Sequence, residues 1–312
     1  MAQSPFARIP HIRLVRAGKL LGSCLYLLDR RHRLIVRRNL QFVFSSMPSQ
    51  AVRRLSIAVF QHVAITALEV LQVSSFERKD LFQRVRLQGE QHLQQLARSS
   101  KGGIFISAHL GNWEIGHIYA SCYLQPPLFL VAKDVRPASL NSMVNAIRTR
   151  FGSTIISKKR ALAPMRRVLK DGGLLGLLID QGVSRTEGVD ISFFGHRVSA
   201  TPVVALLARR YDCPVVPGFC LRESDGQLTL IIKPPLDLQK TADFHYDIKV
   251  NTQKMYDVIE EAIRAYPDQW FWFHKRWKRY HAFLYPEEMA RYERRRKRKK
   301  ASRKKRKRSK SL

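Results

Sequence analysis

The sequence has few cysteines and few acidic residues for its size. Its 312 residues include four cysteines (Cys24, Cys122, Cys213 and Cys220), none in a CxxC pair or at zinc-ligand spacing. We therefore expect no disulfide framework, and a reduced, cytosol-facing location with inert thiols is the simplest interpretation. Asp and Glu number 24 against 56 Lys and Arg, which gives a formal net charge of +32. A chain this basic suits polyanionic partners such as anionic lipid, an acidic carrier protein, phosphorylated substrates or nucleic acid.

Long apolar runs are missing near the N-terminus. The longest uncharged stretch there, residues 20–28, has nine residues and is too short to span a bilayer. No secretory signal pattern is evident either. Residues 12–38 instead mix Leu, Ile, Val and Tyr with many arginines, a composition typical of helices that lie in a membrane interface. An ordinary surface helix packed on the core is the alternative.

Several catalytic signatures are also missing. The chain has no G-x-S-x-G elbow, no Walker A sequence, no H-E-x-x-H and no G-x-G-x-x-G. These absences disfavour the commonest hydrolases, nucleoside triphosphatases, zinc metalloproteases and dinucleotide-binding dehydrogenases.

The pattern of apolar residues predicts an α/β fold. Apolar residues make up 45% of the chain, enough for a packed core. Residues 11–98 are predicted to be mostly helical, and 51–73 form the best amphipathic stretch, starting at Pro48 and Ser49. From Lys101 short β-rich runs alternate with helical segments, ending in a hairpin around residues 224–226 and a helix over 243–265. This alternation predicts a three-layer core with a mixed, mainly parallel sheet covered by helices.

Three regions follow from these patterns. We expect a helical membrane-interface and support region over residues 1–98 and an α/β core over 99–283. A basic low-complexity tail covers 284–312, and its last part, 291–312, holds 15 Lys/Arg and one acid, a net charge of +14. Such a tail is expected to be disordered, or helical only when bound.

The stretch ISAHLGNWEIG, residues 106–116, carries the candidate chemistry. Residues 103–107 predict a short buried strand, and residues 113–119 predict a helix. His109 therefore falls in a βα turn, the place where catalytic and binding residues of α/β folds commonly lie. Asn112 is a good helix N-cap, and Gly111 allows the backbone to approach a ligand closely. The helix that starts there presents free N–H groups to negative charge. A capping or loop histidine is the structural alternative, and a metal site of His109, Glu114 and His117 is another.

The preferred interpretation is a His/acid pair that activates a substrate hydroxyl. With an ordinary pKa of about 6.5, histidine can take a proton near neutral pH. A carboxylate within reach would fix the tautomer of the ring and stabilise its cation. The acceptor hydroxyl would then attack a thioester directly, so no protein nucleophile is required.

Six segments together resemble one known family. They are VRRNLQFVF (36–44), SAHLGNWE (107–114), RTRFG (148–152), LLIDQG (177–182), ISFFGHRVSATP (191–202) and PDQWFWFHKRW (267–277). Each is weak alone, but together and in this order they resemble the bacterial lipid A late acyltransferases. This is the lauroyl/myristoyl acyltransferase family, within the lysophospholipid acyltransferase-like superfamily. The similarity extends from about residue 10 to residue 283.

The resemblance implies transfer of a fatty acyl chain from acyl carrier protein to a hydroxyl of a glycolipid, most simply a lipid A precursor. The reaction would take place at the cytoplasmic face of the inner membrane, with a peripheral or monotopic enzyme. No cofactor of its own is implied, because the donor brings a phosphopantetheine thioester. His109 would be the general base and Glu114 its charge partner, with an oxyanion held by N–H groups near Gly111 and Asn112 or by a nearby arginine.

Other residues are implied as substrate-binding or supporting: Lys133, Arg148, Arg150, Asp180 and Gln181. Lys133 departs from the family, which commonly has arginine there, and a lysine lacks the bidentate fork for phosphate. The long basic tail also departs from the family pattern.

Several alternatives stay open on the sequence alone. Asp180 fits a cap, Arg148 and Arg150 fit a solvated helix face, and the aromatic residues at 193–194 and 270–273 fit either the core or an acyl groove. The acceptor is less certain than the reaction, so another glycolipid or a lysophospholipid is an alternative. A nucleic-acid-binding protein is the competing class, but no helix-turn-helix, RRM-like or zinc-finger signature accompanies the basic runs.

Overall fold

Seven strands form the central sheet of this computed structural model, which describes residues 9–124, 128–290 and 294. The helices are α1 (His11–Leu28), α2 (Arg30–Val43), α3 (Ser49–Val73), α4 (Arg78–Arg84), α5 (Glu90–Ala97), α6 (Trp113–Tyr123), α7 (Ala138–Thr149), α8 (Leu162–Lys170), α9 (Val203–Tyr211), α10 (Phe244–Ala265) and the 3₁₀ turn Ala282–Leu284. The strands are β1 (Val85–Gln88), β2 (Gly103–Ser107), β3 (Leu128–Ala132), β4 (Thr154–Ser157), β5 (Leu174–Leu178), β6 (Val189–Phe193), β7 (His196–Ala200), β8 (Val215–Arg222) and β9 (Leu228–Ile232).

The sheet is mixed and mainly parallel, as the sequence predicts. Its order is β1-β9-β8-β2-β5-β3-β4, and every neighbouring pair is parallel except β8 with β9. The antiparallel pair β8 and β9 is the hairpin predicted around residues 224–226. Strand β2 is buried at all five residues, which is typical of a parallel strand covered on both faces.

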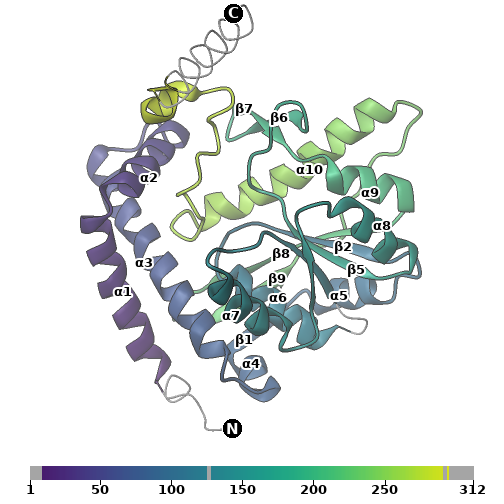
Figure 1. Cartoon of the computed structure of the whole chain (residues 1–312), viewed down its shortest axis with the longest axis horizontal. Coiled ribbons are helices and arrows are strands. Elements are labelled where there is room, and N and C mark those ends of the chain that lie inside the picture. The colour runs from purple at the N-terminus through teal and green to yellow at the C-terminus, as the bar shows by residue number, and fades with distance from the viewer. Residues whose placement is uncertain (1–8, 125–127, 291–293, 295–312) are drawn as a thin grey trace, which may run out of the picture.

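Two apolar clusters cover the two faces of this sheet. In β2, Ile104 and Ile106 belong to one cluster and Phe105 to the other, as the alternation of side chains along a strand requires. Helices α2, α8, α9 and α10 contribute to the first cluster, and α4, α5, α6 and α7 to the second. Figure 1 shows the sheet between these two layers.

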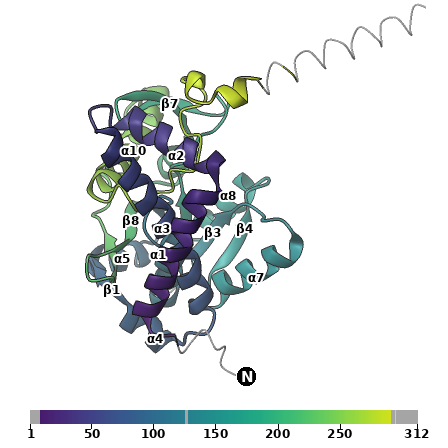
Figure 2. The ribbon, with the colours of Figure 1, turned by 90° about the vertical axis from the view of Figure 1, so that its left-hand side faces the viewer.

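The N-terminal helices stand along one side of the sheet, with α1 outermost (Figures 1 and 2). Helix α3 begins at Ser49 after Pro48, as predicted. Helix α1 packs closely on α3 at Gly18 and Gly22, where an added Cβ would overlap the main chain of α3. These two glycines, one helical turn apart, therefore allow the close approach of the two helices.

Helix α3 also has the length and composition to cross a membrane, alone among the helices in the described part of the chain. However, 56% of its apolar window is buried inside the protein. Length and hydropathy alone therefore do not separate a membrane span from a core helix here, and the observed packing is that of a core helix.

Strand β1 and the pairing of β6 with β7 were not predicted, although the β-rich run that contains β6 was. Strand β1 lies within the region expected to be mostly helical and pairs in parallel with β9, more than 140 residues further along the chain. Strands β6 and β7 form a separate two-stranded hairpin. Strand β1 has only four residues. An alternation of apolar and polar residues this short cannot be recognised in the sequence between two helices.

Candidate active site

His109 lies in the turn between β2 and α6, as predicted. The Asn112 side chain accepts a hydrogen bond from the Ile115 N–H at 3.1 Å, so Asn112 is the N-cap of α6. Gly111 has a φ of 63°, and an added Cβ would overlap the Cys220 carbonyl oxygen on β8. Glycine is therefore required for the packing of this turn against β8, rather than for the approach of a ligand.

Asp180 is the carboxylate that contacts His109. It follows the end of β5, the strand beside β2, so the two residues meet at one edge of the sheet. Its Oδ1 accepts a hydrogen bond from His109 Nδ1 at 2.8 Å. Its Oδ2 accepts from the His109 backbone N–H at 3.1 Å and from Trp270 Nε1 at 2.8 Å. With three N–H donors and an exposed fraction of 3%, this carboxylate is held in one orientation.

The pKa values of the pair move in opposite directions. Burial alone would raise the pKa of Asp180, but the charge and hydrogen bonds of His109 outweigh it and lower the pKa to about 2. Burial alone would lower the pKa of His109, but the charge and hydrogen bond of Asp180 outweigh it and raise the pKa above its usual value. Asp180 is therefore ionised at neutral pH, and it stabilises the cationic form of His109.

The second ring nitrogen of His109 is the one available for chemistry. Because Nδ1 donates to Asp180, the neutral ring carries no proton on Nε2. The Gln181 side-chain amide nitrogen lies 3.3 Å from Nε2. The rings of Trp113 and Phe271 flank the imidazole, with centroids 5.3 Å and 6.2 Å away. The arrangement holds an unprotonated nitrogen at a partly exposed position, as a general base requires.

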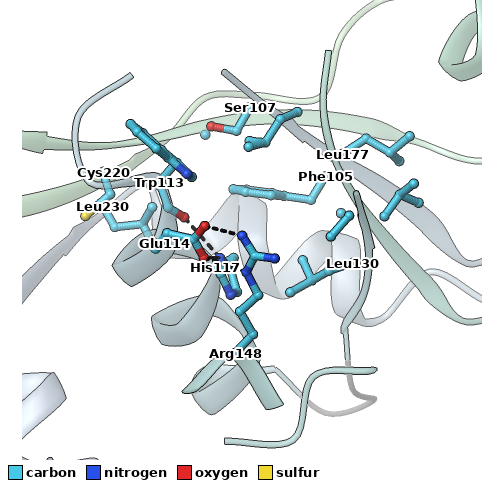
Figure 3. A pocket seen from close by; sticks show the side chains of 16 residues that line it. Phe105, Ser107, Trp113, Glu114, His117, Leu130, Arg148, Leu177, Cys220 and Leu230 are labelled. Carbon is cyan, nitrogen blue, oxygen red and sulfur yellow. Dashed lines mark hydrogen bonds and ion pairs between the residues drawn. The ribbon is translucent and has the colours of Figure 1, made fainter. Parts of the chain in front are cut away.

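Glu114 is paired with Arg148 (Figure 3). Arg148 Nε donates to Glu114 Oε2 at 2.9 Å, and a second guanidinium N–H donates to Oε1. The orienting hydrogen bond of His109 thus goes to Asp180 and not to Glu114. Glu114 still raises the pKa of His109 through its charge, after the larger contributions of burial and Asp180.

The two backbone N–H groups proposed for an oxyanion are already engaged. The Gly111 N–H donates to the Gln269 carbonyl oxygen at 3.0 Å, and the Asn112 N–H donates to the Cys220 carbonyl oxygen at 2.7 Å. These two N–H groups are therefore not the donors for an oxyanion, which leaves the expectation of a nearby arginine. Both residues instead support the turn that carries His109.

A buried ionic cluster ties this turn to helix α3. Glu69 on α3 is 1% exposed and accepts hydrogen bonds from Arg222 at 2.6 Å and 2.5 Å, and from His11 at 2.9 Å. The Asn112 side-chain amide donates to the same carboxylate at 2.8 Å. Burial raises the pKa of Glu69, but these partners outweigh it and lower the pKa to about 2. One charged side chain thus holds α1, α3, β8 and the N-cap of α6 together.

His62 makes a second contact from α3 to the turn. Its Nε2 donates to the Gly111 carbonyl oxygen at 3.0 Å. Burial lowers the pKa of His62 to about 4, so the ring is neutral at physiological pH. Its role is to fix the backbone of the turn.

A cleft of about 680 Å³ opens onto this site. Its polar side chains include His109, Glu114, Lys133, Arg148 and Gln181. Its apolar wall comes from four elements and one loop. The residues are Val131, Leu162, Met165, Leu177, Leu178, Val183 and Val203. An inner, mainly apolar cavity of about 60 Å³ lies beside the ion pair of Glu114 and Arg148 (Figure 3).

Comparison with known proteins identifies the family. Residues 5–279 match the family model described as bacterial lipid A biosynthesis acyltransferase. The chain belongs to this family. It is similar to the lipid A biosynthesis lauroyltransferase of Escherichia coli, with 23% identity over 87% of each chain. It is also similar to the lipid A biosynthesis acyltransferase of Haemophilus influenzae, with 21% identity over 78% of this chain and 74% of that protein.

Most of the site residues that the sequence predicts lie together in the structure. His109, Glu114, Lys133, Arg148 and Gln181 line the cleft, and Asp180 lies directly behind His109. Arg150 does not join them: its guanidinium donates to the Ser74 carbonyl oxygen and stacks over Phe151. Within the described residues, no group of three His, Cys, Asp or Glu side chains is placed to hold a metal ion.

The aromatic residues divide between core and cleft. Phe193, Trp270 and Trp272 are buried in the first apolar cluster. Phe271, in contrast, lines the cleft beside His109. Trp270 thus points inward and the next residue, Phe271, points into the cleft.

Three parts of the site were missed. Lys158 and Arg160 line the cleft mouth, and Arg160 has a φ of 57°, a backbone conformation that a side chain of this size rarely adopts. The sequence predicts Trp270 as part of the core or of a groove, and the structure adds a hydrogen bond from its indole N–H to Asp180. Glu69 carries no local signal, because its partners are distant in the chain.

Proposed function

We propose that this protein transfers a fatty acyl chain from acyl carrier protein to a hydroxyl of a lipid A precursor, using His109 as the general base. Membership of the lipid A acyltransferase family supports the reaction class. The observation that carries the proposal is the hydrogen bond from His109 Nδ1 to Asp180 at 2.8 Å, which leaves Nε2 directed to a cleft of about 680 Å³.

The proposed reaction needs no covalent enzyme intermediate. His109 Nε2 removes the proton of the acceptor hydroxyl while its oxygen attacks the thioester carbon. Collapse of the tetrahedral intermediate forms the ester and breaks the carbon–sulfur bond, and the imidazolium returns its proton to the thiolate of the carrier arm. Gln181, 3.3 Å from Nε2 in the free protein, would be displaced by the acceptor hydroxyl.

Arg148 is the donor we propose for the oxyanion. The N–H groups of Gly111 and Asn112 are engaged within the turn. Arg148 lines the cleft and uses two of its five N–H groups on Glu114. The remaining donors carry a fixed positive charge, which strengthens a hydrogen bond to a developing anion.

Glu114 acts in this scheme through charge and position. Its carboxylate holds Arg148 in place through two hydrogen bonds. Its negative charge also raises the pKa of His109, after the larger contributions of burial and Asp180, and so favours the imidazolium. The His-x4-Glu pair thus works as two linked pairs, His109 with Asp180 and Glu114 with Arg148.

The outer cleft is the space we propose for the acyl chain. The inner cavity, at about 60 Å³, is the smaller of the two spaces beside the Glu114–Arg148 ion pair. The outer cleft is about ten times larger and has an apolar wall. Each buried methylene there is worth about 0.8 kcal/mol.

Helix α1 supports the proposed location on the inner membrane. Its outer face exposes Leu20, Leu21, Leu25, Leu27 and Leu28, and Leu28 is 81% exposed. Arg13, Arg16 and Lys19 lie on the same helix. Exposed apolar side chains next to cations are typical of a helix that lies in the membrane interface. The enzyme would then meet its lipid acceptor from the cytoplasmic face.

Purified protein should convert a lipid A precursor and an acyl carrier protein thioester to an acylated product, detected by mass spectrometry. His109→Ala should lower kcat by about 10² to 10⁴-fold with little change in melting temperature. His245→Ala is the matched control, because His245 is exposed on α10 and lies outside the cleft. A folded His109→Ala protein with normal turnover would contradict the mechanism.

The acceptor is tested in cells. Lipid A from a strain that lacks this protein should miss one acyl chain by mass spectrometry. If lipid A is unchanged and a phospholipid or another glycolipid is changed, that other lipid is the acceptor and the proposed lipid A precursor is not.

A further inference from the structure

A strip of unpaired cations runs from the β4–α8 loop along α8. It consists of Lys158, Lys159, Arg160, Arg166, Arg167 and Lys170, and all six are exposed. None of the six makes an ion pair with any carboxylate in the described part of the chain. We call these six residues the α8 basic surface. Their charges are open to a partner, since the protein itself does not neutralise them.

The α8 basic surface is continuous with the mouth of the active-site cleft. Lys158, Arg160 and Leu162 line the cleft that contains His109. Arg166, Arg167 and Lys170 line the adjacent surface hollow. Leu162 lies between the two groups and is 52% exposed. The surface thus combines a central apolar residue with cations on both sides: three in the loop before α8, and three on α8 itself, a nine-residue helix about 14 Å long.

The α8 basic surface and the exposed leucines of α1 belong to helices on different sides of the molecule (Figure 1). In Figure 1, α1 and α3 stand on one side of the molecule and α8 lies on the opposite side, beyond the sheet. A flat membrane that contacts the outer face of α1 therefore does not reach α8. The partner that fits the α8 basic surface is a soluble polyanion.

We propose that the α8 basic surface is the docking site of the acidic carrier protein that delivers the acyl thioester. This inference rests on the proposed function. A carrier docked there presents its prosthetic arm at the cleft mouth between Lys158 and Leu162, and the thioester can then extend toward His109. Opposite charges steer the encounter and hold the two proteins together, so the surface acts on donor capture rather than on the chemical step.

The test reverses the charges that are furthest from His109. The variant is Arg166→Glu, Arg167→Glu and Lys170→Glu together, three exposed residues outside the catalytic cleft. The matched control is Arg86→Glu, Arg98→Glu and Lys249→Glu, which makes the same change in net charge at exposed positions elsewhere. Both proteins are compared with the unaltered protein using acyl carrier protein thioester and using the acyl pantetheine thioester, which has no carrier protein.

For the α8 variant, kcat/KM for the carrier thioester should fall by about 10-fold to 100-fold, which lies within the range that electrostatic steering supplies. Its kcat/KM should also lose most of its dependence on salt. The value for the acyl pantetheine thioester and the kcat at saturating carrier should stay within about twofold of the unaltered protein. The control variant should keep kcat/KM for both donors.

Three results overturn the proposal in different ways. Equal losses in the α8 variant and the control would show a general effect of net charge. An equal loss with both donors would show that α8 affects the chemistry or the acceptor. If the α8 variant keeps its kcat/KM for the carrier thioester but no longer binds anionic vesicles, the α8 basic surface binds anionic lipid and not the carrier. If the unaltered protein transfers from neither thioester, the proposed function itself fails.

Discussion

Replacing Asp180 by asparagine tests the central contact of the site. Asp180 Oδ2 accepts two N–H groups, from the His109 backbone and from Trp270, while Oδ1 accepts one, from His109 Nδ1. Asparagine has a single acceptor oxygen, which is best placed where the two donors converge. Its NH₂ group then faces Nδ1, which must be unprotonated to accept from it. The proton of the neutral ring moves to Nε2, the atom that has to receive the proton of the acceptor.

Asp180→Asn should therefore lower kcat by about 10² to 10⁴-fold, or about 3–5 kcal/mol in transition-state stabilisation. The pH profile should change as well. In the unaltered protein His109 must be neutral to act, and its raised pKa puts the acid limb of kcat/KM above about pH 6.5. Without the Asp180 charge, burial dominates and the pKa falls, so the acid limb of the remaining activity should move to lower pH.

The assay is kcat/KM between about pH 5 and pH 9 with product detection by mass spectrometry, together with the melting temperature. Asp247→Asn is the matched control, because Asp247 is a buried aspartate paired with Arg209 at the start of α10. The control should lose melting temperature and keep kcat. An Asp180→Asn protein with near-normal kcat and an unmoved acid limb would refute the idea that Asp180 orients His109.

Three further predictions concern the turn, the ionic cluster and the tail. Gly111→Ala should lower the melting temperature by several degrees more than Gly195→Ala, because both glycines have positive φ but only an added Cβ at Gly111 meets neighbouring atoms. Glu69→Ala should destabilise the protein by about 3–5 kcal/mol in denaturant titration, since it leaves Arg222, whose side chain is only 10% exposed, without its carboxylate. The stability that Glu69 contributes should be present above about pH 4.5 and lost as the pH falls toward its pKa of about 2. Deleting residues 291–312, which carry a charge of +14 and lie almost entirely outside the described residues, should weaken binding to anionic vesicles in a salt-dependent way yet preserve turnover on detergent-dispersed acceptor.

Local patterns were enough to predict most of the elements. The start of α3 after Pro48, the N-cap Asn112 and the β8–β9 hairpin all depend on residues within a few positions of one another. Their energetics are local: a cap, a turn and an amphipathic period are set by neighbouring residues. The alternation of strands and helices was likewise readable, because it restricts the fold to a covered, mainly parallel sheet.

The pairing within the site depended on the tertiary structure. The sequence places Glu114 five positions after His109, yet the helix that begins between them turns Glu114 toward Arg148. The parallel pairing of β2 and β5 brings Asp180, 71 residues away, against the imidazole instead. Spacing along the chain determines which residues are near one another, but not the direction in which each side chain points.

The sequence by itself determined the fold class, the family and the residue types that gather at the cleft. The partners of each charge were decided only when distant segments packed together. Glu69 meets Arg222 across 153 residues and holds the N-cap of α6 through Asn112. A buried charge must find opposite charge and hydrogen bonds wherever the packed chain supplies them, and no local pattern records which distant residue does so.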